Sequence, residues 1–145
     1  MNTNNMKYQF LPNTADIKFQ AFGNSIEDAF TNSAYALVEI MCKEKIKDAL
    51  VTKIKVNGKD YESLLVNFLG EFLFLLDSQN FILNKINRIS KIQLNKNKEY
   101  ELTADISGDN AKNYEISHNI KAITYNDMLI EEKKNKWLCQ VVVDV

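Results

Sequence analysis

Carboxylates beside apolar strand segments are the groups in this sequence best suited to chemistry. The sequence ends in three valines followed by Asp144 and Val145, so the Asp144 side chain and the main-chain carboxylate of Val145 are neighbours at the edge of a predicted core. Two adjacent negative groups repel each other unless a positive group lies between them. A hard cation, which prefers oxygen ligands, or a Lys or Arg of a partner would supply that charge.

Two further acidic residues and one lysine are candidates for the same kind of site. Asp16 lies where a loop enters a predicted strand, and Asp127 lies in a predicted tight turn. Taken singly, each carboxylate is most simply a turn-forming or strand-capping residue. Asp16 and Asp144 are harder to explain in that way, because both adjoin segments that should be buried. Lys121, in the apolar run 120–125, is either a snorkelling side chain on a half-buried sheet or a cation for Asp16, Asp144 or a phosphate.

Other catalytic chemistry has little support in the sequence. There is no P-loop, glycine-rich dinucleotide motif, zinc-protease motif or nucleophile elbow. The single histidine, His118, has no orienting partner near it in the sequence, which favours an ordinary exposed strand or loop residue. Cys42 and Cys139 lack metal-type spacing and lie in apolar stretches, so we expect two buried, reduced thiols.

Composition predicts one ordinary globular domain over residues 1–145. The chain is 46% hydrophobic and 26% charged, with a formal net charge of −1. That balance gives no reason to expect strong direct nucleic-acid binding, although the lysines are unevenly spread and leave a local basic patch open. No signal peptide is visible. The most apolar run, Leu64–Leu76, is shorter than the roughly 20 residues that span a bilayer, so we expect a soluble, cytoplasmic protein without a membrane partner.

The elements that must position these groups divide into a helical first part and a strand-rich second part. The first part is predicted to hold a flexible tail over 1–6, strands over 7–10, 17–22 and 51–56, and amphipathic helices over about 25–41 and 60–76. Ser25 and Asp60 are good N-caps for the two helices. Each N-cap follows a glycine by two residues, at Gly23 and Gly58, which indicates a duplicated strand–helix unit.

The second part alternates apolar and polar residues in five runs separated by turn residues. Strands are predicted over 81–94, 99–107, 116–125, 128–133 and 137–144, with a hairpin turn at 133–136. Helices early and strands late favour an α+β fold, with two amphipathic helices packed on antiparallel or mixed β-sheet.

Several blocks taken together resemble the archease family. They keep their order and spacing from about residue 7 to the last residue, essentially the whole chain. The first is similar to the Pro-His-Thr-Ala-Asp block of that family and ends at Asp16. The blocks are Lys7–Asp16, Gly23–Ala29 with the helix after it, Leu75–Asp77, Ile120–Tyr125 and Val142–Val145.

The resemblance implies an accessory protein, not an enzyme in itself. Archeases assist the RtcB-type RNA ligase, which joins a 2′,3′-cyclic or 3′-phosphate end to a 5′-hydroxyl end in tRNA splicing and RNA repair. They promote guanylylation of the ligase and multiple turnover, so GTP and tRNA are reached through the ligase. The resemblance also implies a divalent cation, calcium before magnesium or manganese, bound by Asp16, Asp144 and the terminal carboxylate of Val145.

The sequence departs from the family pattern at its candidate partner-facing surface. Asn13 stands in place of the histidine before Thr14, Asn126 in place of the histidine after Thr-Tyr, and Tyr114 where a histidine is common. Asparagine keeps hydrogen-bonding capacity but cannot transfer a proton near neutral pH. The candidate partner-facing residues are Asn13, Lys121, Thr124, Tyr125 and Asn126.

Two other interpretations of the carboxylates remain open. In the first, the protein is a metal-independent adaptor or chaperone-like module, and the carboxylates bind a partner's Lys or Arg. In the second, two Asp residues and a metal ion activate water for hydrolysis. The second is disfavoured because the sequence is poor in acid–base groups.

Overall fold

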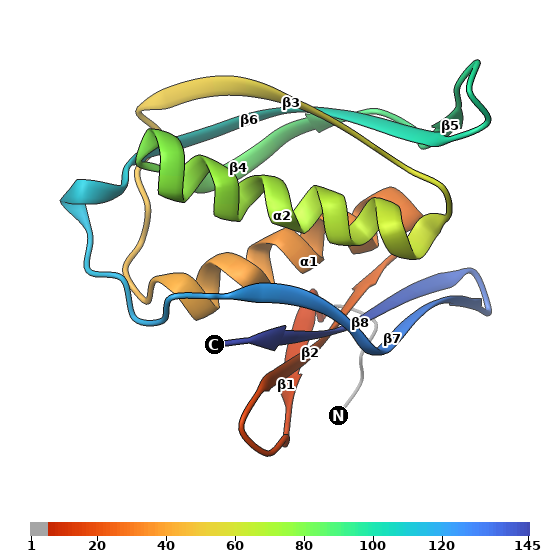
Figure 1. The fold of residues 1–145 in the computed structure, drawn as a ribbon, viewed down its shortest axis with the longest axis horizontal. Coiled ribbons are helices and arrows are strands. Elements are labelled where there is room, and N and C mark those ends of the chain that lie inside the picture. The colour runs from red at the N-terminus through yellow and green to blue at the C-terminus, as the bar shows by residue number, and fades with distance from the viewer. Residues whose placement is uncertain (1–5) are drawn as a thin grey trace.

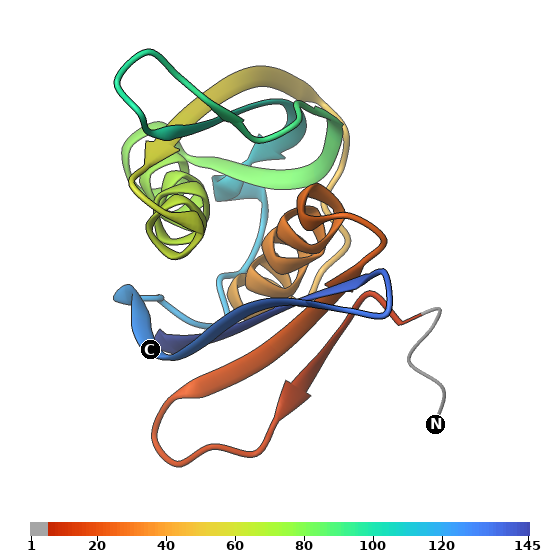
Figure 2. The same ribbon diagram turned by 90° about the vertical axis from the view of Figure 1, so that its right-hand side faces the viewer.

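Two helices lie side by side between two antiparallel β-sheets, which gives three layers (Figure 1, Figure 2). The computed structural model describes residues 6–145, so all of the predicted tail except Met6 lies outside the described residues. The elements are β1 Tyr8–Leu11, β2 Ile17–Gly23, α1 Ile26–Met41, β3 Leu50–Gly58, α2 Tyr61–Gln79, β4 Phe81–Ile89, β5 Gln93–Leu94, β6 Tyr100–Asn110, the 3-10 helix η1 Ala111–Asn113, β7 Ala122–Lys133 and β8 Lys136–Asp144.

One sheet joins the beginning of the chain to its end. Its strand order is β1-β2-β8-β7, and we call it sheet A. Strand β8 pairs with β2 from Trp137 opposite Gly23 to Val143 opposite Ile17. The apolar side chains of β2 and β8 that face inward, Phe19, Cys139 and Val141 among them, are fully buried against α1. The predicted burial of the last strand is therefore confirmed.

The other sheet is built from the middle of the chain. Sheet B has the order β3-β6-β4, and the short strand β5 also pairs with β6. Helix α2 packs on this sheet and also contacts β7 of sheet A. Its buried leucines and phenylalanines meet those of α1 in the centre of the molecule, for example Phe68 against Phe30, with 5.8 Å between ring centroids.

Both predicted helices are present with their predicted N-caps. The Ser25 hydroxyl accepts the Asp28 N–H at 3.0 Å, and Asp60 forms a reciprocal capping box with Ser63. Helix α2 continues to Gln79, three residues beyond the predicted end, because Asn80 supplies a left-handed C-cap (φ 53°). The α+β fold with two helices on antiparallel sheets is confirmed.

The repeated strand–helix unit has a physical basis in two close approaches. A Cβ atom on Gly23 would lie 2.5 Å from the Ala29 nitrogen, and one on Gly58 would lie 2.4 Å from the Leu64 nitrogen. In each unit the end of a strand thus touches the first turn of the following helix. One copy belongs to sheet A and the other to sheet B.

The predicted strands of the second part are wrong in two places. The run 81–94 is not one strand. The Ser90 hydroxyl accepts the Thr103 N–H at 2.9 Å, in place of a main-chain carbonyl of the β-ladder. Strand β4 therefore ends at Ile89, and β5 forms separately. The run 116–125 is a loop as far as residue 121. There the Ser117 N–H donates to the Met41 carbonyl of α1 at 2.7 Å, which leaves the strand to begin at Ala122.

The two cysteines are free and buried, as predicted. Burial raises the pKa of the Cys139 thiol to about 12. Within residues 6–145, none of the helices combines the length and the apolar character that crossing a bilayer requires.

Candidate functional site

The register of sheet A places Asp16 opposite Asp144. Ile17 pairs with Val143 at the last position of the β2–β8 ladder, so the next residue on each strand is an aspartate. On its other side Asp144 pairs with Ala122 of β7, and its carbonyl accepts the Lys121 N–H at 2.7 Å. Both aspartates are half-buried. Residues far apart in the sequence therefore form one acidic end of the sheet.

The last residue is fixed by its own side chain. Val145 is partly buried and packs against the central core. Its main-chain carboxylate follows Asp144 directly, at the end of the sheet where the β1–β2 loop and the start of β7 also lie (Figure 2). We call the group formed by Asp16, Asp144 and the Val145 carboxylate the acidic end.

Within residues 6–145, no lysine forms an ion pair with an aspartate of this acidic end. Residues 6–145 contain three ion pairs, and neither Asp16 nor Asp144 takes part in any of them. Lys18 pairs with Asp127 at 3.6 Å instead. Lys121 precedes β7 and its side chain is exposed, so its predicted place on a half-buried strand is wrong. Among the described residues, the counter-charge expected from the sequence is therefore not supplied by an ion pair with Asp16 or Asp144.

A large bulge in β7 lies next to this end of the sheet. Thr124 pairs with Val142 and Leu129 pairs with Gln140, so the four residues 125–128 of β7 lie opposite a single residue of β8. The predicted tight turn at Asn126–Asp127 is wrong, because the residues on both sides pair with the same strand and the chain cannot reverse there. Asp127 keeps the left-handed conformation of a turn residue (φ 53°) inside the strand.

Side chains of the neighbouring strands hold the bulge in place. The Gln140 amide donates to the Asp127 carbonyl at 2.7 Å and in turn accepts from the Gln20 amide at 2.8 Å. The Thr124 hydroxyl donates to the Val142 carbonyl at 2.9 Å. These contacts leave Tyr125 58% exposed.

Four of the five candidate partner-facing residues are exposed. Asn13 is exposed in the β1–β2 loop, and Tyr125 and Asn126 are exposed on the bulge, with Lys121 beside them just before β7. Thr124 is half-buried and contributes to the sheet, because its hydroxyl is engaged with β8.

The comparison with known proteins decides the family. A model of the Archease protein family matches residues 8–145. The chain belongs to the archease family.

Relatives of this archease-family chain match all or nearly all of its length. Protein archease of Methanosarcina barkeri is 35% identical over 148 residues, with 100% of each chain covered. The solution structure of protein 1598 of Methanobacterium thermoautotrophicum is similar with a TM-score of 0.78 at 27% identity, over 96% of this chain and 99% of that one. The crystal structure of an archease of Thermotoga maritima, described as a possible chaperone, shares the fold at a TM-score of 0.61 and 20% identity, over 93% and 94%.

The donors at the acidic end of this archease-family chain suit a hard cation. They are two carboxylate side chains and one main-chain carboxylate, all oxygen ligands of the kind that calcium and magnesium prefer. Within the described part of the chain, no three His, Cys, Asp or Glu side chains gather closely enough to hold a metal ion. A metal site here therefore depends on the terminal carboxylate as its third group.

His118, the other group considered from the sequence, lines a cavity together with Ile17 and Ile40. It is in the loop before β7, and its Nδ1 atom is 3.2 Å from the Ile40 carbonyl at the end of α1. That contact supports the structural interpretation of an ordinary loop histidine.

A second polar cluster was not predicted from the sequence. Asp109 is only 7% exposed; its carboxylate accepts the Tyr114 hydroxyl at 2.6 Å and the Asn110 N–H at 2.8 Å. The Tyr114 hydroxyl also accepts the Lys47 N–H at 2.9 Å. These hydrogen bonds, that of Tyr114 first, hold the pKa of Asp109 below its ordinary value, and the same bond raises the pKa of Tyr114. Through these hydrogen bonds, Tyr114 connects the loop after η1 to the α1–β3 loop.

Proposed function

We propose that this chain is an accessory protein that activates an RtcB-type RNA ligase in tRNA splicing and RNA repair, by promoting guanylylation and multiple turnover of the ligase. The observation that carries the proposal is the register of sheet A, in which Ile17 pairs with Val143, so that Asp16 and Asp144 are the next residues along the two strands. Membership of the archease family supports it. The acidic end holds a divalent cation, with calcium ahead of magnesium and manganese in preference.

In this proposal, one group of residues binds the cation and another group contacts the ligase. Asp16, Asp144 and the Val145 carboxylate hold the cation, which when bound supplies positive charge to the triphosphate oxygens of the nucleotide used by the ligase. The exposed residues Asn13 and Tyr125 contact the ligase surface. Asn126 does so too, as a hydrogen-bonding group only, so this contact does not depend on histidine protonation.

The test replaces each aspartate without altering its shape. Asp16→Asn and Asp144→Asn should both abolish stimulation of ligase guanylylation, measured with labelled GTP, and should remove the calcium-binding heat in a calorimetric titration. Asp48→Asn is the matched control, because it removes the same charge from an exposed loop residue on another part of the surface. Circular dichroism should show all three variants folded. Normal stimulation by both Asp16→Asn and Asp144→Asn would refute the proposal.

A metal-independent adaptor is the second candidate, and one observation favours it. Within residues 6–145, no third acidic side chain joins Asp16 and Asp144 in a metal-type cluster, and Lys121 and Tyr125, near the start of β7, are exposed. Such a surface can bind a partner's Lys or Arg directly. Titration with calcium, magnesium and manganese separates the two candidates: no heat with any ion, together with intact ligase stimulation, identifies the adaptor.

A further inference from the structure

The cations of this chain are concentrated in one acid-free stretch. Residues 78–98 contain five cationic residues and no Asp or Glu: Lys85, Arg88, Lys91, Lys96 and Lys98. The other 124 residues hold the remaining 13 Lys and Arg together with all 19 Asp and Glu, a formal net charge of −6. The whole-chain net charge of −1 therefore conceals a strong separation of charge.

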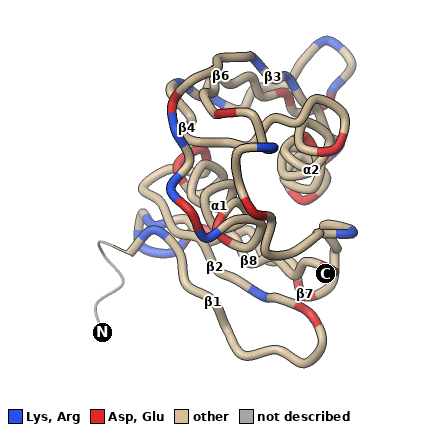
Figure 3. The backbone as a smooth tube through the Cα atoms, turned by 90° about the vertical axis from the view of Figure 1, so that its left-hand side faces the viewer, with Lys and Arg blue, Asp and Glu red and all other residues tan. Residues whose placement is uncertain are grey.

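This stretch forms one edge of sheet B. Strand β4 pairs with β6 from residue 104 to 110 and β5 pairs with it at 100–101, both on the side of β6 away from β3. The stretch therefore follows β6 along nearly its whole length and ends in the β5–β6 hairpin, far from the C-terminus (Figure 1, Figure 3). We call this surface, residues 85–98, the basic edge.

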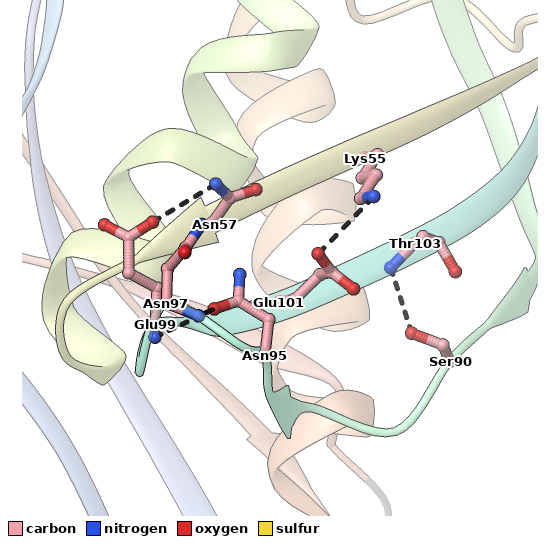
Figure 4. A network of polar contacts seen from close by, with 8 residues as sticks. All are labelled: Lys55, Asn57, Ser90, Asn95, Asn97, Glu99, Glu101 and Thr103. Carbon is pink, nitrogen blue, oxygen red and sulfur yellow. Dashed lines mark hydrogen bonds and ion pairs between the residues drawn. The ribbon is translucent and has the colours of Figure 1, made fainter.

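The five cations of the basic edge are exposed and have no ionic partner within residues 6–145. The neighbouring lysines of β3 differ in this respect. Lys53 pairs with Asp105 at 3.6 Å, and Lys55 pairs with Glu101 at 3.4 Å (Figure 4). Carboxylates of the central strand β6 thus pair with the lysines of β3, whereas the carboxylate at the basic edge, that of Glu27, accepts the main-chain N–H of Ile92 at 2.8 Å and pairs with none of the five cations.

The hairpin at the end of the basic edge has a defined shape. The Asn95 side-chain oxygen accepts the N–H groups of Asn97 at 2.8 Å and Glu99 at 3.1 Å (Figure 4). Lys98 has a left-handed backbone (φ 63°) that closes the turn. This turn presents Lys96 and Lys98 at a fixed place beyond the end of β5.

The uncharged side chains of this stretch are better suited to binding a sugar–phosphate backbone than to binding a protein surface. Asn87, Gln93 and Asn97 are exposed between the cations, and Lys, Arg, Asn and Gln are the usual donors to phosphate and sugar oxygens. The only aromatic residue of residues 78–98, Phe81, is buried. Protein interfaces have an aromatic or apolar centre, whereas Leu94 is the one large apolar side chain exposed here.

We propose that the basic edge binds the sugar–phosphate backbone of a single-stranded RNA, without reading its bases. Lys85 lies in β4 and Lys91 lies just beyond its end, and the six residue steps between them span at most about 20 Å, a length that covers several nucleotides. With no exposed aromatic side chain for base stacking, the affinity is electrostatic and falls steeply with salt. This inference does not rest on the proposed ligase activation, because the acidic end takes no part in it.

The test measures binding of the full chain to a fluorescein-labelled single-stranded RNA of mixed sequence by anisotropy, over a series of salt concentrations. Arg88→Gln/Lys91→Gln should weaken binding on the order of tenfold at low salt and flatten the plot of log affinity against log salt by about 1.4, the value for two lost phosphate contacts. Lys133→Gln/Lys134→Gln removes the same charge from the exposed β7–β8 hairpin and should leave binding unchanged.

Four outcomes would overturn the proposal. They are no binding of wild-type protein to RNA at low salt, an equal loss of binding in the control variant, displacement of RNA by polyglutamate at equal charge concentration, and tighter binding of the matching DNA strand than of the RNA. Polyglutamate displacement would identify an acidic protein as the occupant of the basic edge. Asp144→Asn should bind RNA as wild type does, so failure of the ligase proposal leaves this result intact.

Discussion

At the scale of single residues, the sequence indicated the acidic end but not the Asp109–Tyr114 pair. Asp16 and Asp144 stood out because each adjoins apolar strand residues, and a carboxylate in such a place needs a partner. Asp109 lies beyond the predicted end of its strand, and its partner follows five residues later. No local sequence pattern indicates that Asp109 and Tyr114 are hydrogen-bonded. Only the 3-10 turn after β6 brings the Tyr114 hydroxyl back to the carboxylate.

The Asp109–Tyr114 hydrogen bond should make stability depend on acid pH. Because the pKa of Asp109 is lower in the folded than in the unfolded chain, the pair adds stability above about pH 3.9, and this is lost as pH falls through the folded-state pKa. Tyr114→Phe should therefore be less stable than wild type near neutral pH in urea unfolding, and the difference should shrink below about pH 4.

The control for this prediction is Tyr125→Phe. Its ring is 58% exposed, so loss of the hydroxyl should leave stability unchanged at every pH. A difference between Tyr114→Phe and wild type that stayed constant from neutral to acid pH would show that the hydrogen bond to Asp109 is not its cause.

At the scale of elements, local signals predicted the helices well and the late strands poorly. Helices α1 and α2 are defined by caps and by apolar spacing within each segment, which are visible in the sequence. Strand β7 is defined by its partner: Asn126–Asp127 has the composition of a turn, but pairing with β8 on both sides makes it a bulge. Likewise, the Ser90 side chain ends β4 through a bond to β6 that no local pattern reveals.

Gly58 at the end of β3 and Gly70 within α2 allow a matched test of the strand–helix unit. Gly58→Ala would set a methyl group 2.4 Å from the Leu64 nitrogen, where main chain must move, so we expect a loss of about 1–3 kcal/mol in urea unfolding. Gly70→Ala, within α2, meets no atom within 4 Å and should gain roughly 0.5–1 kcal/mol. Equal effects of the two substitutions would show that the close approach at Gly58 is unimportant.

At the scale of the whole molecule, two charged surfaces lie at opposite ends of the fold. The acidic end belongs to sheet A and the basic edge to sheet B, with both helices between them (Figure 1). The formal net charge of −1 gives no indication that the two surfaces have opposite charge. The clustering of lysines was visible in the sequence, but their exposure along one sheet edge required the pairing of β4 and β5 with β6.

The inclusion of the Val145 carboxylate in the acidic end gives a prediction for a chain that ends at this residue. A short Gly-Ser extension after Val145 would turn that carboxylate into a neutral peptide group, so calcium should bind more weakly, as measured by calorimetry. The Val145 side chain would still pack on the core, so the thermal midpoint without calcium should stay close to that of wild type. An extended protein that bound calcium as tightly as the unextended one would contradict a terminal ligand.

In the sequence, all strands of sheet B lie between the first two and the last two strands of sheet A. This order has a consequence during synthesis. Strand β2 is made early, yet its partner β8 spans residues 136–144 and leaves the ribosome after all the strands of sheet B. Sheet B, whose strands all lie between residues 50 and 110, can pair before that. The acidic end therefore comes into existence only when translation has reached Asp144 and the last strand has docked. A partner that responds to the acidic end would respond only to molecules translated that far and folded, and would ignore shorter fragments.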